Sequence, residues 1–167
     1  MPLLFESSMV SDGNLGLKYG KYDEVISNRV RFLAQHNLFI DDCVMMELEH
    51  DDVISLVTNE HRGQGMRVSR AGVRAEALVT NIPKLPLFLL TGDCFPVAYH
   101  DPVKNVIALA HLGWKPTDLE LARKTGERMI KEFDSDPGDI VVHLGPGVHK
   151  QSYKTLNPSQ KSDVRWD

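Results

Sequence analysis

The sequence predicts an α+β fold in a single domain. The length of 167 residues suits one domain, since domains commonly have about 100–200 residues. A composition of 42% hydrophobic and 25% charged residues is typical of a globular protein and excludes collagen, coiled coils and wholesale disorder. The predicted strands and helices mix without a strict βαβ alternation, which favours α+β over a doubly wound parallel sheet.

Two segments have the apolar spacing of helices. In the segment from Asp23 to Asn37, apolar residues recur at intervals of four and three, and Asp23 is placed to cap the helix or to complement its dipole. A second helix is predicted from Thr117 to Phe133, with Pro116 suited to its start.

Short apolar runs between polar or turn residues predict strands. Asp101-Pro102 is a turn signal, so the two runs that flank it are expected to form a hairpin. The predicted strands are Cys43–Leu48, Val53–Val57, Ala77–Thr80, Leu87–Leu90, Pro96–Tyr99, Asn105–Ala110 and Ile140–Leu144.

Charge and targeting signals indicate a soluble cytoplasmic protein. Nineteen basic and 23 acidic residues give a net charge of −4, a poor match to a general nucleic-acid binder. The N-terminus has no basic region before its short apolar run, so no signal peptide is predicted. The longest apolar stretch, Leu85 to Leu90, is too short to span a bilayer. Two cysteines are too few for a disulfide framework, which favours a reducing compartment.

Reactive side chains concentrate at the ends of the predicted hairpin. Cys94 precedes one arm and His111 follows the other, so the two are expected to converge. A thiolate and an imidazole suit zinc, whose catalytic sites use three protein ligands and an open position. They also suit nucleophilic catalysis, with Cys94 as thiolate and His111 as base. The structural alternative is a buried cysteine beside a hydrogen-bonded histidine.

A third metal ligand would come from another histidine. His50 and His61 lie near predicted strand edges or loops, and the residues alone do not choose between them. The other candidates are His36, His100, His143 and His149.

Several short motifs together resemble the laccase-domain family, whose members are labelled multicopper polyphenol oxidase, purine nucleoside phosphorylase or peptidoglycan editing factor. The order Asp-Cys-x-Pro and then His-x-Gly-Trp-Lys is the specific part of this resemblance. The matching pieces are Asn14-Leu15-Gly16-Leu17, Asn28-Arg29, Glu49-His50-Asp51-Asp52-Val53, Val57-Thr58, Arg62-Gly63-Gln64-Gly65, Ala77-Leu78-Val79-Thr80, Asp93-Cys94-Phe95-Pro96, His111-Leu112-Gly113-Trp114-Lys115 and Leu144-Gly145-Pro146-Gly147.

The resemblance implies a layered α/β/β/α sandwich, of the laccase-domain or cysteine-hydrolase type, with a metal triad of His50, Cys94 and His111. It therefore favours His50 over His61. It implies zinc-dependent cleavage of adenosine, inosine and methylthioadenosine by phosphate, with adenosine deamination as a side activity. Copper oxidation of phenols is disfavoured, because laccase chemistry needs several copper ions. One cysteine and two histidines form at most one copper site. No nucleic acid or membrane partner is expected.

Other residues in the matching motifs are candidates for supporting roles. Asp93 is a candidate ligand-orienting or acid/base group, with a turn or cap aspartate as the structural alternative. Arg62 and Lys115 are candidates for holding phosphate or ribose, with a solvated surface as the alternative. Asn14 is a candidate substrate contact, with loop fixation by its side chain as the alternative.

Departures from the family pattern motivate two alternative functions. Leu48, Asp51 and Pro116 replace a glutamine and two glycines of the family motifs. Family members also continue well past this length, so residues 1–167 are expected to lack the family's C-terminal portion. Exposed apolar edges would then favour association into homo-oligomers. The alternatives are a metal-free Cys-His hydrolase or deamidase, and a degenerate, non-catalytic relative.

Overall fold

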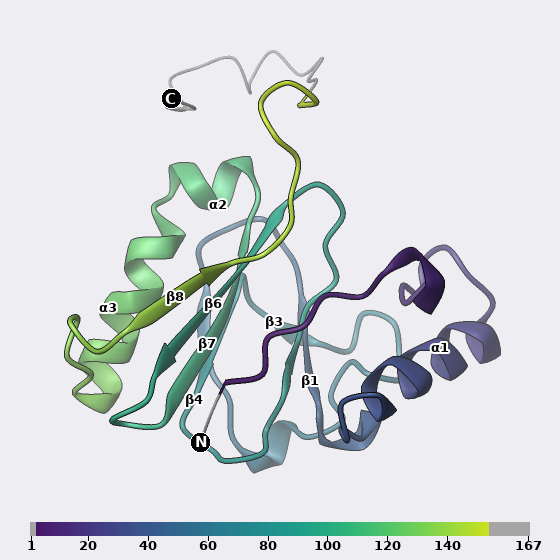
Figure 1. Cartoon of the computed structure of the whole chain (residues 1–167), viewed down its shortest axis with the longest axis horizontal. Coiled ribbons are helices and arrows are strands. Elements are labelled where there is room, and N and C mark those ends of the chain that lie inside the picture. The colour runs from purple at the N-terminus through teal and green to yellow at the C-terminus, as the bar shows by residue number, and fades with distance from the viewer. Residues whose placement is uncertain (1–2, 154–167) are drawn as a thin grey trace.

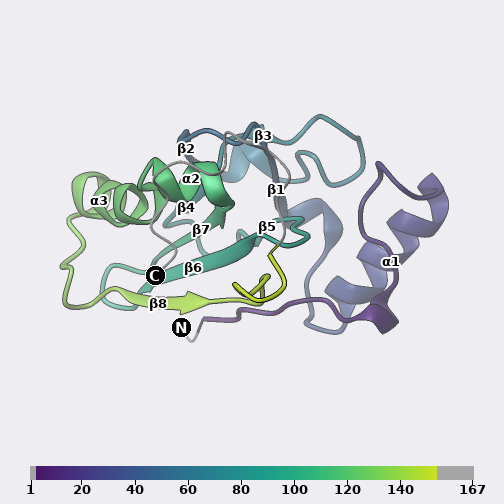
Figure 2. The same cartoon turned by 90° about the horizontal axis from the view of Figure 1, so that it is seen from above.

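A computed structural model describes residues 3–153 and shows two β-sheets with helices packed on their outer faces (Figure 1, Figure 2). One sheet has five strands in the order β2-β4-β7-β6-β8, and the other has three in the order β3-β1-β5. The strands are β1 Val44–Glu47, β2 Ile54–Leu56, β3 Val73–Arg74, β4 Ala77–Thr80, β5 Leu87–Phe88, β6 Phe95–Asp101, β7 Val106–Leu112 and β8 Val141–Leu144; the helices are α1 Tyr22–Ala34, α2 Trp114–Asp118 and α3 Leu121–Phe133, with short 3-10 helices η1 Val10–Asp12, η2 Ile40–Asp42 and η3 Asn59–His61.

The β6–β7 hairpin is the centre of the five-stranded sheet. Its antiparallel register runs from Phe95 opposite Leu112 to Asp101 opposite Val106, and Asp101 fixes the turn by accepting hydrogen bonds from the backbone N–H groups of Val103 and Lys104. The predicted hairpin is confirmed. Its strands are longer than predicted, and β7 extends through His111.

Alternation of side chains along β1 places the smaller sheet between two apolar layers. Val44 and Met46 join a core cluster with Leu78 and Leu109 of the other sheet, whereas Met45 joins a cluster with Phe32 of α1. Successive residues of a strand point to opposite faces, so one face of this sheet packs on α1 and the other on the five-stranded sheet.

The outer face of the five-stranded sheet packs on α3. Val79 of β4 and Ala110 of β7 form a third core cluster with Leu121 and Met129 of that helix. The order of layers is therefore α1, three-stranded sheet, five-stranded sheet, α3. This confirms the predicted α+β fold and its α/β/β/α layering.

The second predicted helix is broken into two. α2 ends at Asp118 and α3 begins at Leu121, because Glu120 between them has a left-handed backbone with φ of 59°. Leu121, Thr125 and Met129 are the buried residues of α3, so the buried face of this helix repeats every four residues. The first helix begins at Tyr22 and ends at Ala34, earlier than predicted.

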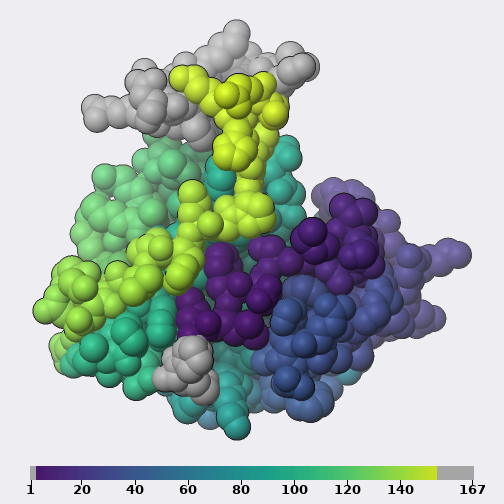
Figure 3. Space-filling view, viewed as in Figure 1, coloured from purple at the N-terminus to yellow at the C-terminus, as the bar shows by residue number. Residues whose placement is uncertain are grey.

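The remaining strands differ from the predictions mainly at their ends. β5 covers only Leu87–Phe88, and the two-residue strand β3 was not predicted. The N-terminal segment crosses the molecule between β8 and α1 without forming a strand (Figure 3). Within residues 3–153, no helix is both long and apolar enough to cross a bilayer.

Candidate active site at one end of the five-stranded sheet

The hairpin brings Cys94 and His111 together, as the sequence predicts. Cys94 immediately precedes β6, and His111 lies opposite Pro96 near the end of β7. The imidazole of His111 is buried, with an exposed fraction of 2%, and its Cε1 and the Sγ atom of Cys94 both lie beside Gly113, close enough for the two side chains to interact. Cys94 itself is half-buried, so the pair lies at the boundary between core and surface.

Glu76 is a buried member of this site that sequence reasoning missed. Its carboxylate is fully buried, and its Oε2 lies 2.6 Å from Nδ1 of His111. The backbone N–H of His111 also donates to the Glu76 carbonyl at 2.8 Å. A charged residue directly before a fully buried strand was the available signal, because an acidic side chain is almost never fully buried unless it is paired.

His50 completes the cluster from the loop between β1 and β2. Its ring is edge-on to that of His111, with ring centroids 5.3 Å apart and an interplanar angle of 89°. The backbone N–H groups of Glu49 and His50 donate to Oε1 of Glu76 at 2.7 and 2.5 Å. His50 has a left-handed backbone with φ of 59°, a conformation that costs a non-glycine residue about 1–2 kcal/mol.

His61, the other candidate, forms a hydrogen bond within its own turn. Its Nδ1 accepts a hydrogen bond from the backbone N–H of Thr58 at 3.1 Å in the 3-10 helix η3. The structure thus brings His50, and not His61, into contact with His111.

The contacts within the cluster favour a protonated His111 and an ionised Glu76. Burial alone would lower the pKa of His111, but its hydrogen bonds to Cys94 and Glu76 outweigh burial and raise the pKa to about 9. Burial alone would raise the pKa of Glu76, but the hydrogen bonds from His111 and from the backbone N–H of His50 lower it. Glu76 is therefore a buried carboxylate whose negative charge is matched by its donors.

The donor set of Cys94, His50 and His111 has the chemistry that zinc prefers, namely thiolate and imidazole. Within residues 3–153, however, no group of three or more His, Cys, Asp or Glu side chains is already arranged to hold a metal ion. The His111 ring and the Cys94 side chain instead interact directly with each other. Zinc binding would therefore replace that direct interaction.

Asp93 and Asn14 line a different hollow. A cavity of about 1200 Å³ extends between the N-terminal segment, α1, β1 and β5, and both residues lie on its wall, whereas His50, Cys94 and His111 do not. The Asn14 side chain bonds the backbone of Gly16 in both directions, at 2.8 and 3.1 Å, which is the loop-fixing alternative. Asp93 is exposed, and its carbonyl accepts from the backbone N–H of Val148 at 2.8 Å.

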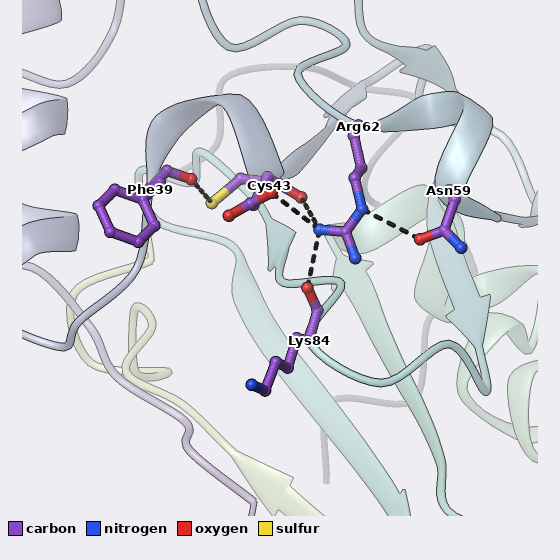
Figure 4. Close-up of polar contacts among 6 residues, drawn as sticks. Phe39, Cys43, Asn59, Arg62 and Lys84 are labelled. Carbon is purple, nitrogen blue, oxygen red and sulfur yellow. Dashed lines mark hydrogen bonds and ion pairs between the residues drawn. The ribbon is translucent and has the colours of Figure 1, made fainter.

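Arg62 forms its hydrogen bonds with residues outside the cluster of His50, Glu76, Cys94 and His111. Its guanidinium donates to the Asn59 side chain at 3.0 Å, to Asp42 Oδ1 at 3.1 Å and to the Lys84 carbonyl at 2.8 Å (Figure 4). These contacts connect the end of η3 to the end of η2 and to the loop before β5, and the structure does not bring Arg62 together with His111.

Lys115 lies nearer to the cluster. It is exposed on α2, which begins directly after Gly113. The ammonium of Lys124, bonded to the Asp52 carboxylate, lowers the pKa of Asp52, and Lys115 adds a smaller contribution. Because Asp52 is two residues from His50, Lys115 is the candidate cation closer to the site.

The three departures from the family motifs have local structural roles. Leu48 packs against the core between the sheets, Asp51 accepts a hydrogen bond from the backbone N–H of Val53 at 3.0 Å, and Pro116 is buried within α2. None of the three is a member of the hydrogen-bonded cluster around Glu76.

Comparison with known proteins shows the family of this chain. The model of the family described as multi-copper polyphenol oxidoreductase laccase matches residues 5–164. The chain belongs to this laccase family. Among curated family relatives, the purine nucleoside phosphorylase YlmD of Bacillus subtilis is 30% identical over 142 residues, covering 84% of this chain and 51% of the relative. The purine nucleoside phosphorylase YfiH of Escherichia coli is 28% identical, covering 84% and 53%.

Solved structures of laccase-family proteins share the fold. A hypothetical protein YfiH from Bacillus licheniformis superposes with a TM-score of 0.81 at 32% identity, and YlmD from Geobacillus stearothermophilus with a TM-score of 0.81 at 28% identity. Each comparison covers 84% of this chain and 53% of the other. The chain thus spans about half the length of the relatives that it matches.

Proposed function

We propose that this chain carries the zinc centre of a purine nucleoside phosphorylase, which cleaves adenosine, inosine or methylthioadenosine with phosphate and deaminates adenosine as a side activity. The observation that carries the proposal is the contact of His50 and Cys94 with the His111 ring. Glu76 fixes that ring through the contact of its Oε2 with Nδ1. The names of the relatives from Bacillus subtilis and Escherichia coli support the nucleoside and phosphate substrates.

In this proposal His50, Cys94 and His111 hold zinc. The metal supplies Lewis acidity and makes water a stronger acid near neutral pH. In phosphorolysis a phosphate oxygen forms a bond to C1′ of the ribose, the bond from C1′ to the purine nitrogen breaks, and the purine leaves with its electron pair and gains a proton. Asp93, next to Cys94, is the proposed acid/base group, and Lys115 is the proposed phosphate contact.

The deciding experiment measures metal content and activity in matched variants. Plasma mass spectrometry is expected to find about one zinc ion per wild-type chain. His50→Ala should lose it, and His61→Ala should keep it, because His61 contacts its own turn. Nucleoside cleavage that needs both phosphate and zinc should be found in the wild type and in His61→Ala and should be lost in His50→Ala. Folded wild-type protein without zinc, or equal zinc in both variants, would contradict the proposal.

A second function is favoured by one observation, the chain of contacts from Glu76 through His111 to Cys94. It has the order carboxylate, imidazole, thiol that metal-free cysteine hydrolases and deamidases use. In that case His111 accepts the proton of the Cys94 thiol, and the sulfur forms a bond to the substrate carbonyl carbon. The bond from that carbon to the leaving group breaks, and the leaving group takes the proton from His111. Water then hydrolyses the thioester and frees Cys94, while Glu76 orients the His111 ring throughout. Activity that resists chelators and disappears when Cys94 is alkylated would establish this function and exclude the zinc enzyme.

A further inference from the structure

Glu76 contacts both histidines of the cluster from a single buried carboxylate. Its Oε2 contacts Nδ1 of His111 at 2.6 Å, and its Oε1 accepts from the backbone N–H of His50 at 2.5 Å. The two oxygens therefore act on different residues. One faces a side chain on β7, and the other faces the backbone of the loop between β1 and β2.

The contact with His111 determines which ring nitrogen carries the proton. A buried carboxylate only accepts hydrogen bonds, so Nδ1 of His111 must be the donor. The neutral ring then leaves Nε2 with its lone pair free, on the side of the ring remote from Glu76. Metal-binding histidines are oriented in this way when a carboxylate accepts from the other ring nitrogen.

The contact with the His50 loop stabilises an unfavourable backbone. His50 has φ of 59°, and the adjacent N–H groups of Glu49 and His50 both point at Oε1 of Glu76. Charge-assisted hydrogen bonds are stronger than neutral ones, so the two N–H donors to the Glu76 carboxylate stabilise a left-handed backbone that is unfavourable for any residue other than glycine. This loop conformation holds the His50 ring against His111.

We infer that Glu76 is the positioning residue of this site: it sets the tautomer of His111 through Oε2 and the backbone of His50 through Oε1, so that Nε2 of His111 keeps its lone pair and the His50 ring stays against the His111 ring. The part of the inference that concerns zinc affinity rests on the proposed zinc centre. The part that concerns the tautomer does not, because it needs only the contact with His111.

Glu76→Gln tests the tautomer with little change in shape. The glutamine oxygen still accepts from the His50 loop, but its NH₂ group donates toward Nδ1 and cannot accept from it. His111 must then protonate at Nε2. The measurement is the nitrogen-15 spectrum of the His111 ring at an alkaline pH where the ring is neutral, in a Cys94→Ala background that removes the competing thiol. The ring proton should lie on Nδ1 when Glu76 is present and on Nε2 in the Glu76→Gln variant.

Zinc affinity tests the consequence for the site. Glu76→Gln should weaken zinc binding about 10–100-fold, the usual effect of losing such a partner, while the thermal unfolding midpoint of the metal-free protein changes little. Glu76→Asp keeps an acceptor and should recover part of the affinity. Glu49→Gln is the charge-matched control, because the Glu49 side chain is half-exposed and faces Arg74; it should bind zinc as the wild type does.

The tautomer measurement and the zinc-affinity measurement test the inference independently. A proton on Nε2 with Glu76 intact would overturn the inference whether or not zinc binds. Zinc binding by Glu76→Gln as tight as that of the wild type would also overturn it. Wild-type protein that binds no zinc, yet shows the expected tautomer change, would overturn the zinc centre and leave Glu76 as the residue that orients His111 toward Cys94.

Discussion

Gly113 lies directly against Cys94: a Cβ atom added at Gly113 would be 3.1 Å from Cys94 Sγ and 3.5 Å from Cε1 of His111. The approach to Sγ is tighter than ordinary van der Waals contact, which begins at about 3.4 Å. Because Gly113 also precedes α2 directly, the backbone cannot retreat without moving that helix.

Gly113→Ala is therefore expected to displace Cys94 and weaken zinc binding at least about 10-fold, with circular dichroism unchanged. Gly126→Ala is the matched control, because a Cβ there meets nothing within 4 Å. In the interior of α3, that change should stabilise the protein by about 0.5–1 kcal/mol. Zinc titration and urea unfolding of both variants are the measurements. Unchanged zinc affinity in Gly113→Ala would show that Sγ has room to move.

The two cysteines are expected to react very differently with iodoacetamide at neutral pH. Cys43 is fully buried, and burial raises the pKa of its thiol to about 12, so it should remain unmodified in folded protein. Cys94 is half-buried beside His111 and should be alkylated, with saturating zinc slowing the reaction. Peptide mass spectrometry assigns the site. Alkylation of Cys43 before Cys94 would contradict the description of both environments.

Arg62→Ala is expected to destabilise the fold and spare the site. The change removes four hydrogen bonds made by a side chain that is 27% exposed, and we expect a loss of about 1–2 kcal/mol of unfolding free energy. Zinc content should not change. The control is Arg67→Ala, which removes an exposed ion pair with Asp41; solvent screens such a pair, so this change should lower the unfolding free energy much less. A higher KM for phosphate in Arg62→Ala at full stability would instead support a substrate contact.

Tyr99 is expected to make the fold less stable at alkaline pH. Burial raises the pKa of its phenol to about 12 from an ordinary value of 10.0, and its OH donates to the Ala122 carbonyl at 3.0 Å. The unfolded state therefore loses this proton at lower pH than the folded state does. The unfolding free energy should fall as pH rises from about 10 to about 12, by up to about 2–3 kcal/mol.

Urea unfolding at several pH values measures this effect. Tyr99→Phe should remove the pH-dependent part, at the cost of about 1 kcal/mol for the lost hydrogen bond. Tyr22→Phe should leave the pH dependence unchanged, since Tyr22 is exposed. The assignment to Tyr99 would be wrong if both variants kept the wild-type pH dependence.

Apolar periodicity was sufficient to predict the hairpin and most strands, because buried strands such as β4 and β6 are short apolar runs bounded by turns. It did not predict the break at Glu120, since the left-handed residue there has no signal in its side chain. Strand β3 was not predicted, because two residues are too few to show an alternation of apolar and polar side chains. The layered order of sheets and helices came from family resemblance, as pairing between distant strands leaves no local pattern.

The pairing of Cys94 with His111 followed from the hairpin, because the register of two adjacent strands determines which ends meet. The choice of His50 over His61 did not, since it depends on how a loop folds over a buried carboxylate. Glu76 was missed because its partner His111 is 35 residues away in the chain, so no local pattern marks the contact. The contacts of Arg62 were also beyond prediction, because its partners Asp42 and Lys84 are 20 and 22 residues away in the chain.

The wide separation along the chain of the residues that meet at Glu76 has a consequence for folding kinetics. Glu76 is 26 residues from His50 and 35 from His111, and contacts between such distant residues form slowly, since each requires closing a long loop. We therefore expect the cluster to assemble only after β4 and β7 have paired. In a refolding experiment, the spectral band of cobalt added as a zinc substitute should appear in the last phase, later than the recovery of secondary structure.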